Sequence, residues 1–67
     1  MAENKSYSQQ VLEGAVRLLD EAIRTGNRRD IVRSIEMVED DDDVNMFDVS
    51  IGTESEWNIL VERASEL

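Results

Sequence analysis

The chain has 67 residues, a formal net charge of −9, and neither cysteine nor histidine. This length allows one small domain, and the missing residue types exclude disulfide bonds, thiolate or imidazole metal sites, and Ser-His-Asp or cysteine catalysis. No apolar run is long enough for a membrane span, so we expect neither a membrane anchor nor a signal peptide. The lack of cysteine favours a reducing, cytoplasmic setting.

The charge is divided unevenly along the chain. Residues 1–33 carry six basic and five acidic side chains, whereas residues 34–67 carry one basic and eleven acidic side chains. Phosphate backbones and anionic lipids attract the opposite sign. We therefore expect no direct binding to nucleic acid and no binding to membranes, and we expect a basic protein as partner.

Residues 8–25 are predicted to form an amphipathic helix, because apolar residues recur there at three- and four-residue steps. Ser6 and Gln9 have the spacing of a capping box at its start. Gly26 tolerates a left-handed backbone and predicts its end. The preceding polar residues 1–6 are expected to be disordered.

Residues 28–38 are compatible with a helix or with a strand. The next segment, 44–51, alternates in polarity and is rich in β-branched and aromatic residues towards its end, which favours a strand. A strand needs a partner for its backbone groups. We therefore pair it with residues 33–39 as a hairpin, with the four consecutive aspartates in the loop.

Residues 54–66 are predicted to form the last helix. Thr53 and Glu56 have the spacing of a capping box, and Trp57 and Leu60 begin an inward apolar stripe.

The expected fold class is therefore α+β, a single small acidic α-β-β-α domain over residues 1–67 with two helices packed on a β-hairpin. The alternative is a three-helix bundle with residues 28–38 as its middle helix. The helix–hairpin–helix order resembles small phage head–tail joining proteins. That resemblance concerns architecture and implies a structural connector subunit.

Calcium binding and paired-carboxylate catalysis are two possible functions of the acidic run, and the sequence favours neither. An EF-hand loop starting at Asp43 would lack its glycine and would place Phe47 at a ligand position. Catalysis by paired carboxylates needs a cleft that buries one of them, for which so short a chain has little room. We predict no metal, no cofactor and no catalytic residue, and we do not expect an enzyme.

Phosphate mimicry is the interpretation that fits the charge pattern best. Residues 34–62 are 29 consecutive residues with ten carboxylates and no lysine or arginine. A surface selected only for solubility, which is the plain alternative, mixes the two signs. We predict a small acidic inhibitor of a basic nucleic-acid-handling protein, in the functional class of the anti-CRISPR, anti-restriction, repair-inhibitor and transcription-inhibitor proteins of phages and mobile elements. The predicted contact residues are Glu36, Glu39, Asp40, Asp41, Asp42, Asp43, Asp48, Glu54 and Glu56, with Met46 and Phe47 as apolar anchors.

Other functions stay open on the sequence. An antitoxin or immunity protein would use the same acidity against a basic toxin, and a phage connector subunit would use the helices for ring contacts. A homodimer is also possible, because Arg28, Arg29 and Arg33 could pair with the acidic half of a second copy.

Overall fold

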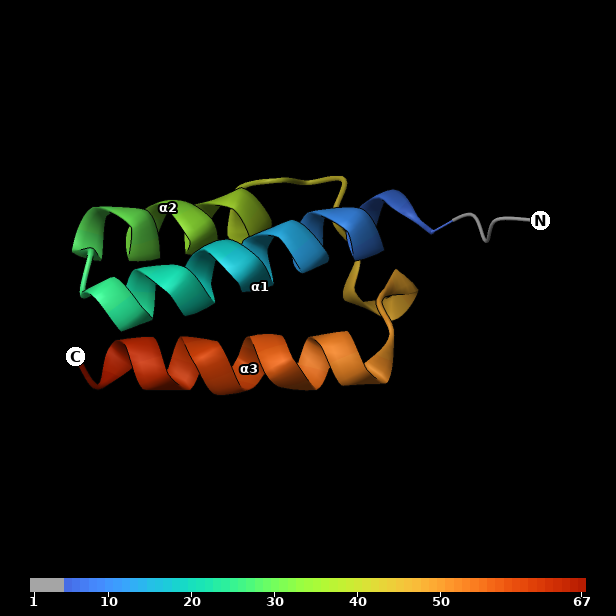
Figure 1. The fold of residues 1–67 in the computed structure, drawn as a ribbon. Helices are drawn as coiled ribbons and strands as arrows, with labels where there is room; N and C mark the ends of the chain where they lie inside the picture. The colour runs from blue at the N-terminus through green and yellow to red at the C-terminus, as the bar shows by residue number, and fades with distance from the viewer. Residues whose placement is uncertain (1–4) are drawn as a thin grey trace.

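The computed structural model describes residues 5–67, and within that range the chain is helical without a strand. Figure 1 shows its three α-helices, α1 (Tyr7–Thr25), α2 (Arg28–Glu39) and α3 (Ile51–Ser65), and the 3-10 turn η1 (Met46–Asp48) that precedes α3. The expected α-β-β-α fold is therefore wrong. The alternative, a three-helix bundle, describes the chain.

Helix α1 begins one residue earlier than predicted and ends at the predicted residue. The Ser6 side chain accepts a hydrogen bond from the backbone N–H of Gln9 at 3.0 Å, which satisfies one of the free donors of the first turn. At the other end Gly26 has a φ of 69°, a left-handed conformation that glycine adopts without a steric penalty. Of the segment expected to be disordered, residues 1–4 lie outside the described residues.

Helix α2 occupies the segment that was paired as the first hairpin strand. Asn27 is its N-cap, since the Asn27 side chain accepts from the backbone N–H of Asp30 at 3.2 Å. The Asn27 amide also donates to the Asp30 carboxylate at 3.0 Å. Asn27 therefore lies just after the end of α1 and also caps the start of α2. This N-cap favours a helix over a strand in the segment that follows.

Residues 44–51 do not form the second strand, because local hydrogen bonds turn the chain. The Asn45 side chain accepts from the backbone N–H of Phe47 at 3.0 Å, and the backbone N–H of Val49 donates to the carbonyl of Met46 at 3.2 Å. Of the apolar residues that would share one strand face, Val49 is buried while Phe47 and Ile51 are exposed. The alternation in the sequence is thus not an alternation of burial.

Helix α3 begins three residues earlier than predicted. Its N-cap is Ser50, whose hydroxyl accepts from the backbone N–H of Thr53 at 3.3 Å. Trp57 and Leu60 are buried, as the sequence predicts.

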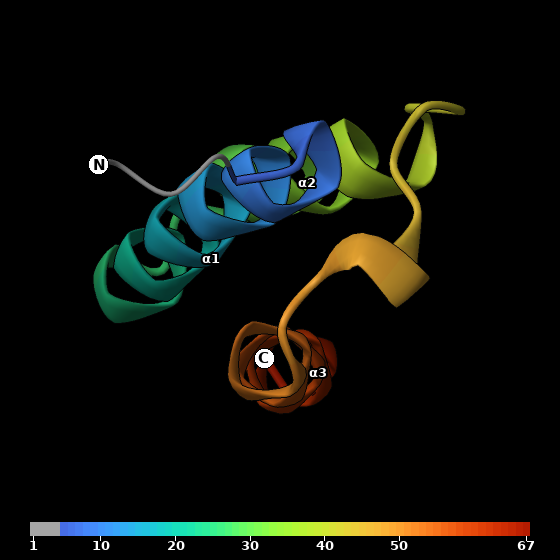
Figure 2. The same cartoon turned by 90° about the vertical axis from the view of Figure 1, so that its right-hand side faces the viewer.

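The core is organised around α1, which packs against both other helices, while α2 and α3 share few contacts with each other (Figure 2). Helix α1 contributes half of the buried apolar residues, and among them Leu12 and Leu19 have no exposed surface. The full set is Leu12, Ala15, Val16, Leu19, Ala22, Ile31, Val38, Val49, Trp57 and Leu60. Over the described part of the chain, no helix has the length and apolar character that crossing a membrane requires.

Candidate functional site

Most of the predicted contact residues lie towards one end of the molecule. Figure 1 shows that the start of α1, most of the connection 40–50 and the start of α3 lie together at that end, whereas α2 ends nearer the middle of the molecule. We call residues 36–56 the acidic end, because they hold nine carboxylates and no lysine or arginine. The junction of α1 and α2 and the end of α3 lie at the other end, where Arg24, Arg28, Arg29 and Arg63 are interspersed with acidic residues.

Four consecutive side chains of α1 and its cap hold the acidic connection in place. We call residues 6–9 the polar clasp. The Ser6 hydroxyl donates to the carbonyl of Asp48 at 2.8 Å, and the Tyr7 hydroxyl donates to the carboxylate of Asp41. Further along the helix, the Ser8 hydroxyl accepts from the backbone N–H of Asn45 at 2.7 Å.

The last member of the polar clasp, Gln9, reaches the start of α3. Its amide oxygen accepts from the backbone N–H of Ser50 at 2.8 Å, and its amide nitrogen donates to the Thr53 hydroxyl at 2.9 Å. The same nitrogen donates to Glu13 on the next turn of α1. The polar clasp therefore fastens the chain at intervals from Asp41 to Thr53.

Apolar contacts also hold the connection 40–50 against the helical core. Val49 is buried in the core, and Val44 and Met46 are half-buried against it. Of the two predicted apolar anchors, Met46 is thus partly committed to the core, whereas the Phe47 side chain is 97% exposed.

The predicted acidic residues differ in how far they are available to a partner. Asp41 is half-buried and accepts from Tyr7 and from the backbone N–H of Asp43 at 2.9 Å, so it is part of the loop structure. Glu54 is half-buried in the first turn of α3, where the helix dipole favours a carboxylate. The others are exposed: Glu36, Glu39, Asp40, Asp42, Asp43, Asp48 and Glu56.

These carboxylates neither form ion pairs with described residues nor cluster around a common point. Between residues 5 and 67, the ion pairs are Lys5–Glu13 and Asp20–Arg24, and neither includes a carboxylate of the acidic end. Over the same residues, no group of three or more His, Cys, Asp or Glu side chains is placed to hold a metal ion. The acidic side chains therefore do not converge on one point.

Two pKa shifts follow from the contacts of the polar clasp. The hydrogen bond to Asp41 raises the pKa of the Tyr7 hydroxyl above its ordinary value, with smaller contributions from burial and from the charges of Asp41 and Asp43. Hydrogen bonds from Gln9 and then Lys5 lower the pKa of Glu13, with further help from the charges of Lys5 and Arg17. Both contacts are strongest in the protonation states that prevail at neutral pH.

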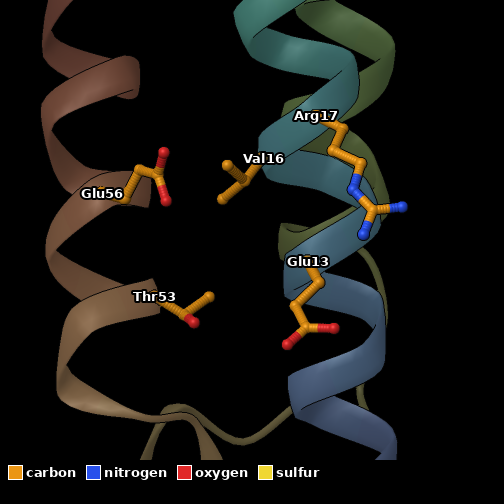
Figure 3. A pocket seen from close by; sticks show the side chains of 5 residues that line it. All are labelled: Glu13, Val16, Arg17, Thr53 and Glu56. Carbon is orange, nitrogen blue, oxygen red and sulfur yellow. The ribbon is translucent and has the colours of Figure 1, made fainter.

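A shallow cavity of about 350 Å³ between α1 and α3 is the second candidate site. Figure 3 shows its lining, with Val16 directed from α1 towards α3 and the carboxylate of Glu56 directed into the gap. Glu13, Arg17 and Thr53 complete the lining. Glu13 is held in its ionised form by Lys5 and Gln9, so it is poorly suited to accept a proton. The acidic end is the stronger candidate.

The polar clasp is the part of this site that the sequence reasoning missed. One signal for it is present: Ser8 lies four residues before Leu12 and therefore falls on the apolar face of α1. Ser8 is buried in the structure. A polar residue on an apolar face needs a hydrogen-bond partner, which here comes from the acidic connection.

No protein-family model, no curated protein and no solved structure matches this chain. Its function is therefore inferred from the charge, exposure and contacts of its own residues.

Proposed function

We propose that this chain is a small, non-catalytic acidic protein that binds a basic nucleic-acid-handling protein. It would inhibit that partner by placing carboxylates where nucleic-acid phosphates bind, in the cytoplasm of a bacterium if the chain is encoded by a phage or mobile element. The observation that carries the proposal is that none of the nine carboxylates at the acidic end forms an ion pair with a described residue.

The number of charges at the acidic end supports the proposal. The two shorter dimensions of the molecule are 21 and 17 Å. A DNA duplex carries one charge per about 1.7 Å, so a 21 Å segment carries about 12. The nine carboxylates of residues 36–56 are therefore close in number to the charges on a duplex segment as long as the molecule is wide.

The polar clasp supports the proposal in a different way. Ordering a loop on binding costs free energy, and a loop that is already ordered avoids that cost. The connection 40–50 is fastened through Asp41, Asn45 and Asp48 before any partner is present. Its like charges are thus held in a fixed arrangement despite their repulsion.

An antitoxin or immunity protein would use the same surface against a basic toxin, and identification of the partner separates the two readings. The hypothesis that the chain is a phage connector subunit no longer has a structural observation to support it. It depended on the helix–hairpin–helix order, and α2 occupies the segment that would have been the first strand of that hairpin.

The test is retention of a partner from bacterial lysate at low salt, with release by duplex DNA or by a salt gradient. The informative variant changes Asp40, Asp42 and Asp43 to Asn and leaves Asp41 unchanged, because Asp41 has a structural role. We expect unchanged folding and at least tenfold weaker binding, which corresponds to about 1.4 kcal/mol. Three exposed charge pairs supply a loss of this order, at about 0.2–1 kcal/mol each.

The matched control changes Glu21, Glu62 and Glu66 to Gln. These residues are also exposed but lie outside the acidic end, and the control loses the same three negative charges. A basic nucleic-acid-binding protein that is retained by the wild type and by the control, but not by the loop variant, supports the proposal. If both variants retained the partner as well as the wild type does, the position of the carboxylates would not matter. The acidic residues would then serve solubility.

A further inference from the structure

The two most exposed large apolar side chains of the described residues both lie at the acidic end. Phe47 in η1 is 97% exposed, and Ile51 in the first turn of α3 is 82% exposed. Other exposed apolar residues, such as Val32 at 53% and Ile59 at 55%, retain far more cover. Scattered exposed apolar residues are ordinary on a protein surface, whereas the two most exposed here lie only four residues apart, in one short segment.

The exposure of Phe47 is fixed by the residues around it. Asn45 accepts a hydrogen bond from the backbone N–H of Phe47, and its own backbone N–H is held by Ser8. On the other side, the carbonyl of Asp48 accepts from Ser6. Because Met46 and Val49 face the core, the turn between them leaves Phe47 on the outside.

Phe47 and Ile51 are close enough to act on one partner surface. They are four residues apart, so their Cα atoms are separated by no more than about 14 Å. Asp48 lies between them in the sequence and is exposed, and the run of aspartates enters the same connection from α2. Two strongly exposed apolar side chains therefore lie within one acidic segment of the chain.

We propose that Phe47, supported by Ile51, is an apolar anchor that enters an apolar pocket bordered by basic side chains on the partner protein. This proposal rests on the proposed function and adds a contact that phosphates cannot make. A phosphate group offers no apolar surface at such a position, so the anchor would let the partner bind this protein in preference to nucleic acid. Burial of one phenylalanine side chain is sufficient for at least a tenfold gain in affinity.

A second copy of the chain is a poorer occupant than a basic protein. A two-fold contact through Phe47 would bring two acidic ends together, each with nine carboxylates and without lysine or arginine. Like charges opposed across an interface are unfavourable. Charge complementarity therefore selects a basic partner.

The test uses two defined probes, amidated nine-residue peptides in which Arg alternates with Leu or with Ser. The two peptides carry the same charge, so their difference reports the apolar contact. We expect the wild-type protein to bind both in a salt-dependent manner and to bind the Arg–Leu peptide at least tenfold more tightly. Phe47→Ala should remove that difference and leave the affinity for the Arg–Ser peptide unchanged.

Ile59→Ala is the matched control, because Ile59 is an exposed apolar residue of α3 beyond its first turn, and it should leave both affinities unchanged. Equal affinity of the wild type for the two peptides would overturn the anchor and leave the charge-based function standing. Absence of salt-dependent binding to either peptide would overturn the proposed function and the anchor with it. Self-association of the wild type that Phe47→Ala abolishes, measured by sedimentation velocity, would assign Phe47 to a second copy and overturn the proposal.

Discussion

The helical core and the acidic end are stabilised in different ways. Along the helices, α1 buries Leu12, Leu19 and their neighbours against α2 and α3. At the acidic end, the connection 40–50 is fastened mainly by side-chain hydrogen bonds from residues 6–9, with Val49 as its one buried apolar residue.

This difference suits the two tasks. Apolar burial has no preferred direction, so it supplies stability along the helices without defining the shape of a loop. Hydrogen bonds are directional and fix individual backbone groups. They hold the connection while its exposed carboxylates and Phe47 face outward.

The largest expected effect comes from breaking the core. Leu19→Ala removes a side chain that has no exposed surface and leaves a cavity between the helices. We expect a loss of about 2.7–5 kcal/mol in the free energy of unfolding, a large part of the stability of so small a domain. Urea unfolding followed by circular dichroism measures it. A loss below 1 kcal/mol would contradict the packing described for α1.

The sequence predicted α1 well because its signals are local. The apolar periodicity, the Ser6 cap and the Gly26 stop all lie within or beside the helix. For α2 the signal was local but ambiguous, because residues 28–38 fit a helix or a strand and Asn27 was not recognised as a helix N-cap. The alternation of residues 44–51 then outweighed the helical spacing of residues 28–38, although it was not an alternation of burial.

The site was predictable in its charge but not in its arrangement. The order of the residues alone shows that the carboxylates lie near one another along the chain. Which side of the turn faces the core, and hence that Phe47 is exposed while Met46 is half-buried, depends on hydrogen bonds to Ser6 and Ser8 about 40 residues earlier. The polar Ser8 on the apolar face of α1 indicates that a hydrogen-bond partner is needed, but no local pattern indicates which distant residue supplies it.

An intermediate effect is expected from breaking the polar clasp. Ser8→Ala removes the acceptor of the Asn45 backbone N–H in a partly buried position. We expect a loss of about 1–2 kcal/mol in the free energy of unfolding, because a donor is left without its partner. Hydrogen exchange of the Asn45 amide should also become faster, since the bond that protects it is gone.

Ser55→Ala is the control for this substitution. Ser55 is exposed within α3, where alanine is a slightly better helix former, so stability should change by no more than about 0.5 kcal/mol. If Ser8→Ala and Ser55→Ala were equally stable and left the Asn45 amide equally protected, the polar clasp would not hold the connection.

The smallest effect is expected from Tyr7→Phe, and its sign depends on pH. The hydrogen bond to Asp41 raises the pKa of the Tyr7 hydroxyl above its ordinary value of 10.0 in the folded state. Its contribution to stability is therefore fully present below pH 10 and is lost as the pH rises through the folded-state pKa.

At neutral pH the Tyr7→Phe variant should have a slightly lower urea midpoint than the wild type. Well above pH 10 the order should reverse, because the wild type then carries a tyrosinate beside Asp41 whereas phenylalanine stays neutral. A midpoint difference that does not change between the two pH values would show that the Tyr7 hydroxyl does not bond to Asp41 in solution, and the acidic connection would then be held by Ser6, Ser8 and Gln9 alone.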